Sequence, residues 1–70
     1  MQNYKIELPG LQRCRLASGL TLAALSKRTG ISVPHLSRLE RGLRHPTLGT
    51  VALLTLAFPF EELLSEDQDA

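Results

Sequence analysis

The sequence predicts an all-α fold, a compact bundle of four or five short helices in a single small domain. Gly and Pro residues recur at short intervals along the 70 residues, and the apolar residues between them recur at helical spacing. No alternating apolar and polar run is long enough to form a strand. Hydrophobic residues make up 43% of the chain and charged residues 21%, a balance typical of a folded domain rather than a disordered one.

The first two helices are expected between Leu11 and Gly30. Leu11 and Cys14 share one face of the first helix, which Gly19 ends. Thr21 can cap the second helix, because its hydroxyl can accept a hydrogen bond from a free N–H of the first turn. Gly30 then ends that helix, since glycine readily adopts the left-handed backbone that closes a helix.

A third helix begins at Ser32 or Val33, with Leu36 and Leu39 facing inward. Pro34 fits the first turn of this helix, where its missing N–H is not needed, but it also favours extended geometry in Val33. The sequence therefore leaves open which of the two residues is the cap.

Thr47 is expected to start a fourth helix, and a fifth helix covers about residues 60–64. The fourth helix carries Leu48, Val51 and Leu54. This organisation divides the chain into an N-terminal extension (1–10), a helical domain (11–64) and an acidic tail (65–70) that we expect to be disordered.

Charge is distributed unevenly, although the formal net charge is only +1. Residues 11–50 contain one acid, Glu40, and seven basic residues: Arg13, Arg15, Lys27, Arg28, Arg38, Arg41 and Arg44. Residues 51–70 contain no base and five acids: Glu61, Glu62, Glu66, Asp67 and Asp69. A basic body of this kind favours a polyanionic partner. A solvated surface with a solubilising tail is the alternative interpretation of the same pattern.

Several classes of protein are disfavoured. The single cysteine, Cys14, cannot form an internal disulfide, and no basic-then-apolar leader opens the chain, so we expect a cytoplasmic protein. The longest apolar stretch, 51–60, is too short to span a membrane. A core this small leaves no room for a large pocket, so no small-molecule effector is expected.

Catalysis and metal binding are also disfavoured. His35, His45 and Cys14 lie on separate elements without zinc-ligand spacing, so no metal or other cofactor is expected. No His–acid set is arranged to activate Ser37, and the chain has no Gly-rich phosphate loop. We therefore expect that the protein is not an enzyme.

The most informative segment is 20–42, which predicts two short helices joined by a tight turn. Ser26 is small enough for the helices to cross closely, Gly30 allows the turn, and Ile31 fills the space beside it. One face of the second helix of the pair stays free of the core, and its size suits the major groove of DNA. This face carries Val33, Pro34, Ser37, Arg38 and Arg41.

The stretch Gly30-Ile-Ser-Val-Pro-His-Leu-Ser-Arg-Leu-Glu-Arg-Gly42, followed by Pro46-Thr-Leu, resembles the phage repressor and Cro-type helix-turn-helix family, also called the XRE family. The resemblance covers roughly residues 11–64 and implies a lambda-repressor-like helical bundle. It also implies double-stranded DNA as partner, with the third helix in the major groove, and a bacterial, phage or plasmid origin.

The resemblance assigns expected roles to individual residues. The positions that read bases in the family hold Val33, Pro34, Ser37 and Arg38. The positions that face the DNA backbone hold Thr21, Ser32, His35, Arg41, Arg44 and His45. Arg15 and Glu40 match a pair that family members bury as an ion pair between the first and third helices.

The chain departs from the family pattern after the fourth helix. The connection at Phe58-Pro59-Phe60 is shorter than usual, and apolar residues stand where polar ones are common. We expect a dimer or partner surface formed by Leu53, Leu56, Phe60, Leu63 and Leu64. Alternatively, the shortened connection rotates these side chains into the core of the monomer.

Three functional hypotheses follow. The preferred one is a sequence-specific DNA-binding transcriptional regulator, a small dimeric repressor or autoregulator that binds a roughly palindromic operator. The second is an antitoxin-like or anti-repressor module that binds a protein partner through its apolar C-terminal surface. The third is that the chain is the DNA-binding fragment of a longer regulator.

Overall fold

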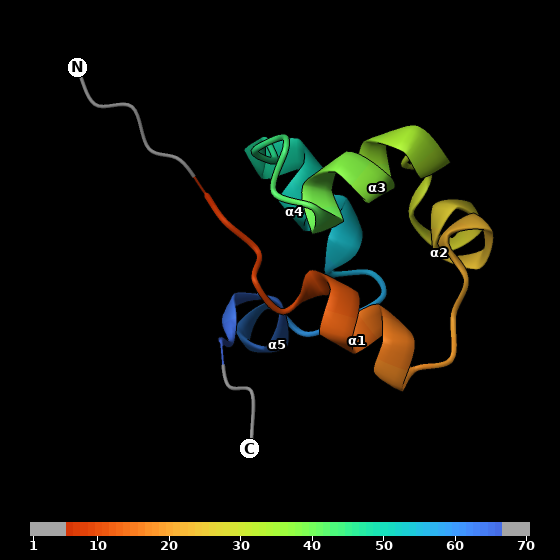
Figure 1. The fold of residues 1–70 in the computed structure, drawn as a ribbon, viewed down its shortest axis with the longest axis horizontal. Coiled ribbons are helices and arrows are strands. Elements are labelled where there is room, and N and C mark those ends of the chain that lie inside the picture. Colours follow the sequence, from red (N-terminus) through yellow and green to blue (C-terminus); the bar gives the residue numbers. More distant parts are fainter. Residues whose placement is uncertain (1–5, 67–70) are drawn as a thin grey trace.

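The computed structural model describes residues 6–66, which form five helices and no strand (Figure 1). The helices are α1 (Leu11–Ala17), α2 (Leu22–Thr29), α3 (Val33–Glu40), α4 (Leu48–Leu54) and α5 (Phe60–Leu64). The predicted all-α bundle is therefore confirmed. The expected N-terminal extension and acidic tail lie partly outside the described residues, at positions 1–5 and 67–70.

Hydroxyl caps start three of the helices. The Oγ1 atom of Thr21 accepts a hydrogen bond from the N–H of Ala24 (3.0 Å) at the start of α2. Ser32 does the same for the N–H of His35 (3.3 Å), so Ser32 is the cap of α3. Thr47 caps α4 in the same way. These caps satisfy N–H groups that have no partner within the helix.

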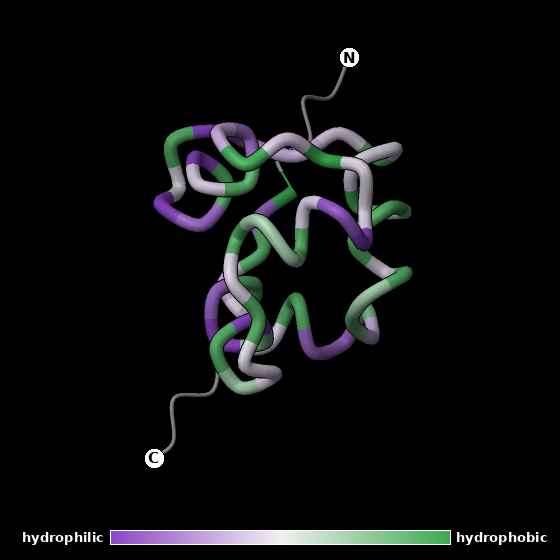
Figure 2. The backbone as a smooth tube through the Cα atoms, turned by 90° about the vertical axis from the view of Figure 1, so that its right-hand side faces the viewer, coloured by the Kyte–Doolittle hydropathy of each residue, from purple (hydrophilic) through white to green (hydrophobic). Residues whose placement is uncertain are grey.

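The core is built mainly from leucine. Five side chains are fully buried: Leu11, Leu25, Leu36, Leu54 and Leu63. Each of the five helices contributes one of them, so no helix could be removed without opening the core. Figure 2 shows hydrophobic and hydrophilic segments alternating along the backbone, as expected for helices that bury only one side.

One apolar residue of α4 lies outside the core, and one expected surface residue lies inside it. Leu48 is 76% exposed, because Thr50, Val51 and Leu54 occupy the inward side of this short helix. Leu63, expected on the partner surface, is fully buried, because α5 packs against α1 with this side chain facing the core.

The segment 6–10 packs onto the bundle. The side chain of Leu8 joins the core, and the N–H of Gly10 donates to the carbonyl oxygen of Leu63 (2.9 Å). On the same side, the guanidinium of Arg13 donates to the carbonyl of Ser65 at 3.3 and 3.4 Å. These bonds hold the C-terminal end of α5 against the start of α1.

Candidate functional site

The site begins with the turn that joins α2 to α3. Gly30 has φ of +80°, a conformation that side chains rarely adopt. The hydroxyl of Thr29 donates to the carbonyl of Leu25 (2.9 Å) and accepts from the N–H of Ile31 (3.2 Å), so one buried side chain holds both sides of the turn. Ile31 is itself 5% exposed and fills the space next to the turn. The angle between α2 and α3 is thus fixed by local contacts.

One face of α3 remains open to solvent. Leu36 and Leu39 face the core, while Val33, Pro34 and Arg38 are exposed. Ser37, expected with them, is half-buried. The spacing of 33, 34, 37 and 38 places these residues along one side of a helix. The structure thus brings the four expected base-reading residues together on a single face.

The residues expected to face the DNA backbone surround this helix. Thr21 and Ser32 are exposed and cap the N-termini of α2 and α3. His35 lies half-buried in the first turn of α3, and Arg41 is the exposed residue that ends this helix. Capped helix N-termini attract anions, because N–H groups and the positive end of the helix dipole point the same way.

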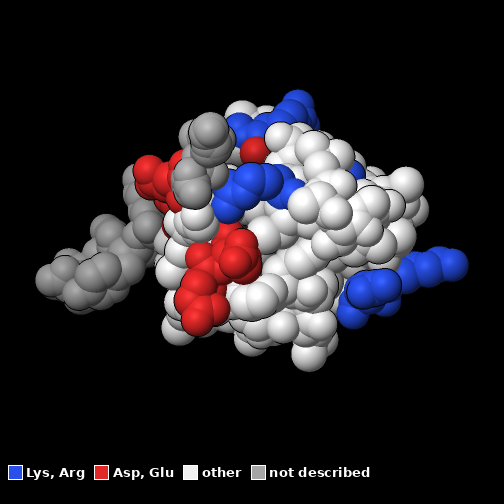
Figure 3. All heavy atoms as spheres, turned by 90° about the horizontal axis from the view of Figure 1, so that it is seen from below, with Lys and Arg blue, Asp and Glu red and all other residues white. Residues whose placement is uncertain are grey.

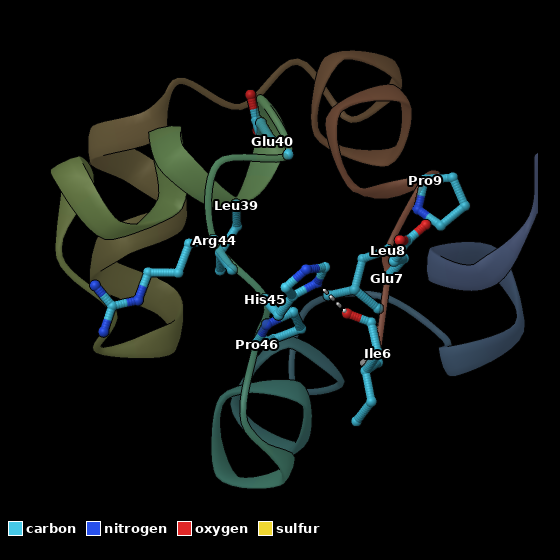
Figure 4. Close-up of a pocket in the computed structure, with 10 residues that line it drawn as sticks. Ile6, Glu7, Leu8, Pro9, Leu39, Glu40, Arg44, His45 and Pro46 are labelled. Carbon is cyan, nitrogen blue, oxygen red and sulfur yellow. Dashed lines mark hydrogen bonds between the residues drawn. The ribbon is translucent and has the colours of Figure 1, made fainter. Parts of the chain in front are cut away.

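Arg44 and His45, the last two expected backbone contacts, point in opposite directions. Figure 4 shows the ring of His45 turned toward the backbone of Ile6, while Arg44 extends away from it. Nδ1 of His45 lies 3.4 Å from the carbonyl oxygen of Ile6. The loop 41–46, the segment 6–9 and the end of α3 line a half-open cleft of about 200 Å³. His45 is therefore held by a hydrogen bond, whereas the exposed side chain of Arg44 extends away from the cleft.

Arg15 and Glu40 form the expected ion pair. Nε of Arg15 donates to Oε2 of Glu40 (2.5 Å), and Nη2 donates to Oε1 (3.0 Å). The two side chains are only 11% and 3% exposed. Nη1 of Arg15 also donates to the carbonyl of Leu20 (2.9 Å), and donating hydrogen bonds to the Glu40 carboxylate raises the pKa of Arg15 above its ordinary value. One guanidinium therefore ties α1, the α1–α2 loop and the end of α3 together.

Acidic and basic side chains are unevenly distributed on the surface. Figure 3 shows that the acidic groups lie toward one side of the molecule, with basic groups among them, and that further basic side chains project at the opposite edge. The described acids near the C-terminus are Glu61, Glu62 and Glu66. The basic residues that project from or follow α2 and α3 are Lys27, Arg28, Arg38, Arg41 and Arg44. The region around α3 thus carries positive charge and is separate from the acidic end.

No group of three His, Cys, Asp or Glu side chains among residues 6–66 could hold a metal ion. Cys14 is half-buried, and burial raises the pKa of its thiol; nearby Arg13 lowers this pKa and Glu62 raises it. A thiol with a raised pKa is a poor nucleophile near neutral pH. In the described part of the chain, no helix is long and apolar enough to cross a membrane.

Four of the five expected partner-surface residues are exposed. Leu56 is 72% exposed, Phe60 47%, Leu64 41% and Leu53 40%. Sequence reasoning missed three further exposed leucines, Leu16, Leu43 and Leu48. The signal for Leu43 is its place directly after Gly42, which has φ of +74° and follows the end of α3.

The helix-turn-helix family model matches residues 11–63. No curated protein and no solved structure matches this chain.

Proposed function

This chain belongs to the helix-turn-helix family of Cro/C1-type (XRE) DNA-binding transcription regulators, and from that premise we propose that it is a sequence-specific regulator acting as a small dimeric repressor or autoregulator. The observation that supports this most directly is the solvent-exposed face of α3, with Arg38 on it and capped helix N-termini beside it. Its site of action is the cytoplasm, on DNA of bacterial, phage or plasmid origin.

Arg38 is the principal base-reading residue of this proposal. Its guanidinium can donate to O6 and N7 of one guanine, which discriminates against other bases by about 1–3 kcal/mol. Val33 and Pro34 offer only apolar contact and suit a thymine methyl group. Ser37, one turn further along the same face, offers a hydroxyl that can donate or accept a hydrogen bond. We therefore expect a half-site with one guanine that dominates recognition.

Phosphate contacts supply most of the affinity in this proposal. The N–H groups at the capped starts of α2 and α3, marked by Thr21 and Ser32, face the backbone on either side of the groove. His35, Arg41, Arg44 and His45 complete the set of expected backbone residues. Such contacts fix the register of the protein on DNA without reading sequence.

Dimerisation is proposed through the exposed C-terminal apolar residues, which are Leu53, Leu56, Phe60 and Leu64. No charged residue occurs from Pro46 to Phe60, and a surface without charge is typical of the centre of an interface. A two-fold dimer would present two copies of α3 to half-sites one helical turn apart, and its operator would be palindromic. The same surface also supports the alternative, an antitoxin-like or anti-repressor module that binds another protein.

Selection of duplexes from a random pool tests this proposal. An enriched palindrome with half-sites one turn apart is expected. Arg38→Ala should weaken the enriched site by about 1–3 kcal/mol and relax one base position. Arg28→Ala, which removes an exposed charge from the last turn of α2, is the matched control and should not alter base preference. Binding without an enriched motif would reject sequence reading, and no binding at low salt would favour the protein-interaction module.

A further inference from the structure

The loop 41–46 is held by contacts near its two ends. Its backbone is tied to α3 by the N–H of Gly42, which donates to Leu39 (3.2 Å), and by the N–H of Leu43, which donates to Arg38 (2.9 Å). Pro46 is buried at its far end. Between these points Arg44 and His45 are both exposed. The middle of the loop therefore needs another support if it is to hold one conformation.

The segment 6–10 provides that support. Leu8 anchors it in the core, and the N–H of Gly10 anchors it to α5. Side-chain packing does not fill the space between segment and loop, which is the cleft of about 200 Å³ described above. Among the described residues, the hydrogen bond that crosses this space joins Nδ1 of His45 to the carbonyl of Ile6 (Figure 4).

We propose that His45 is a positioning residue: it braces the loop against the N-terminal segment and so presents Arg44 to the DNA backbone, rather than contacting a phosphate itself. This inference rests on the proposed function and narrows it. The Nδ1–H of His45 donates to the carbonyl of Ile6. The guanidinium of the adjacent Arg44 points the other way (Figure 4). Arg44 is joined to His45 by one peptide bond, so holding His45 also limits the backbone conformations open to Arg44.

Two variants of His45 separate bracing from direct contact. His45→Ala removes the hydrogen bond to Ile6 together with the rest of the ring. His45→Asn keeps a side-chain N–H close to the position of Nδ1 but has no counterpart of Nε2, the nitrogen left to reach a phosphate. Because His45 is exposed, neither change should unfold the protein, and circular dichroism verifies this.

The brace is tested first in the free protein. The reporter is hydrogen exchange of the Leu43 N–H, which is bonded to Arg38, and the N–H of Leu25 in α2 is the internal reference. Exchange at Leu43 should rise in His45→Ala and return to the wild-type rate in His45→Asn. Arg44→Ala should leave it unchanged.

DNA binding is then measured on a short duplex of arbitrary sequence across a range of salt concentrations. His45→Ala should weaken binding roughly threefold to tenfold and lower the salt slope by about one unit, as expected for one lost phosphate contact. Arg44→Ala should cause the same loss, and His45→Asn should bind like the wild type. The double variant His45→Ala with Arg44→Ala should lose no more than Arg44→Ala alone, because both changes remove one contact.

Failure of rescue by His45→Asn, or losses that add in the double variant, would overturn the proposal and assign His45 a direct phosphate contact. Unchanged exchange at Leu43 in His45→Ala would overturn the brace. If the wild-type protein binds no duplex at low salt, the proposed function fails, whereas the exchange result still decides whether the brace exists.

Discussion

Arg15 and Glu40 are joined by two parallel hydrogen bonds although 25 residues separate them in the chain. Both side chains are largely buried, at 11% and 3% exposure. The third guanidinium nitrogen of Arg15, Nη1, donates to the carbonyl of Leu20. The pair thus connects α1 to the end of the helix that we propose reads DNA. It contributes to architecture, because the three guanidinium nitrogens and both carboxylate oxygens already have partners within the protein.

Breaking this pair should destabilise the fold strongly. In Glu40→Ala the buried guanidinium loses its partner, and we expect about 3–5 kcal/mol lower stability in chemical denaturation. The double variant Arg15→Met with Glu40→Leu removes both charges and should recover much of that loss. A single variant as stable as the wild type would contradict a structural role for the pair.

Gly10 should not tolerate a side chain. A Cβ atom at this position would lie 2.1 Å from the carbonyl oxygen of Glu62, which is backbone and cannot move aside easily. We expect Gly10→Ala to lower stability by about 1–3 kcal/mol, measured by thermal unfolding. Gly49→Ala is the matched control, because the nearest atom to its new Cβ is 3.8 Å away. That change should stabilise α4 by about 0.5–1 kcal/mol, since alanine favours helices.

Substitutions at Leu56 and Leu63 should have different effects, one on dimerisation and the other on stability. Leu56→Glu places a charge on the proposed dimer surface and should convert a sedimenting dimer to monomer while the helical circular dichroism survives. Leu63→Ala removes a fully buried side chain and should cost about 2–5 kcal/mol of stability. A wild-type protein that sediments as a monomer at high concentration would contradict the self-dimer.

Cys14 should be slow to alkylate. Because burial raises the pKa of its thiol above the ordinary value of 9.0, the rate with iodoacetamide should rise at higher pH in the folded protein than in urea. The same shift makes the free energy of unfolding depend on pH. Because the folded state favours the neutral thiol, the contribution of Cys14 to stability is present below pH 9.0 and is lost as the pH rises through the folded pKa. Equal alkylation profiles in the folded and unfolded states would contradict this.

Helix positions and caps were predictable because their signals are local. Thr21, Thr47 and Gly30 each act within one turn of their own position, so their roles could be inferred from neighbouring residues alone. The directions of Leu48 and Leu63 were not predictable in the same way. Helices of seven and five residues contain too few turns to define an inward face, and tertiary packing decides it.

In the candidate site, too, features set by neighbouring residues were predictable and features set by distant residues were not. The exposed face of α3 follows from helical spacing around Leu36 and Leu39, and the structure places the expected residues there. The orientation of His45 depends on the carbonyl of Ile6, 39 positions away in the chain. Nothing in the sequence near His45 indicates that partner.

The hydrogen bond from Gly10 to Leu63 has a consequence for biosynthesis. During translation, the N–H of Gly10 emerges early and has no acceptor until Leu63 has also left the ribosome. Because Leu63 is one of the five fully buried side chains, a nascent chain that stops short of α5 has an open core. Helix α5 is in turn too short to persist alone. Folding of this protein is therefore completed after residue 63 is free, and a stalled shorter chain would expose its leucines to proteases.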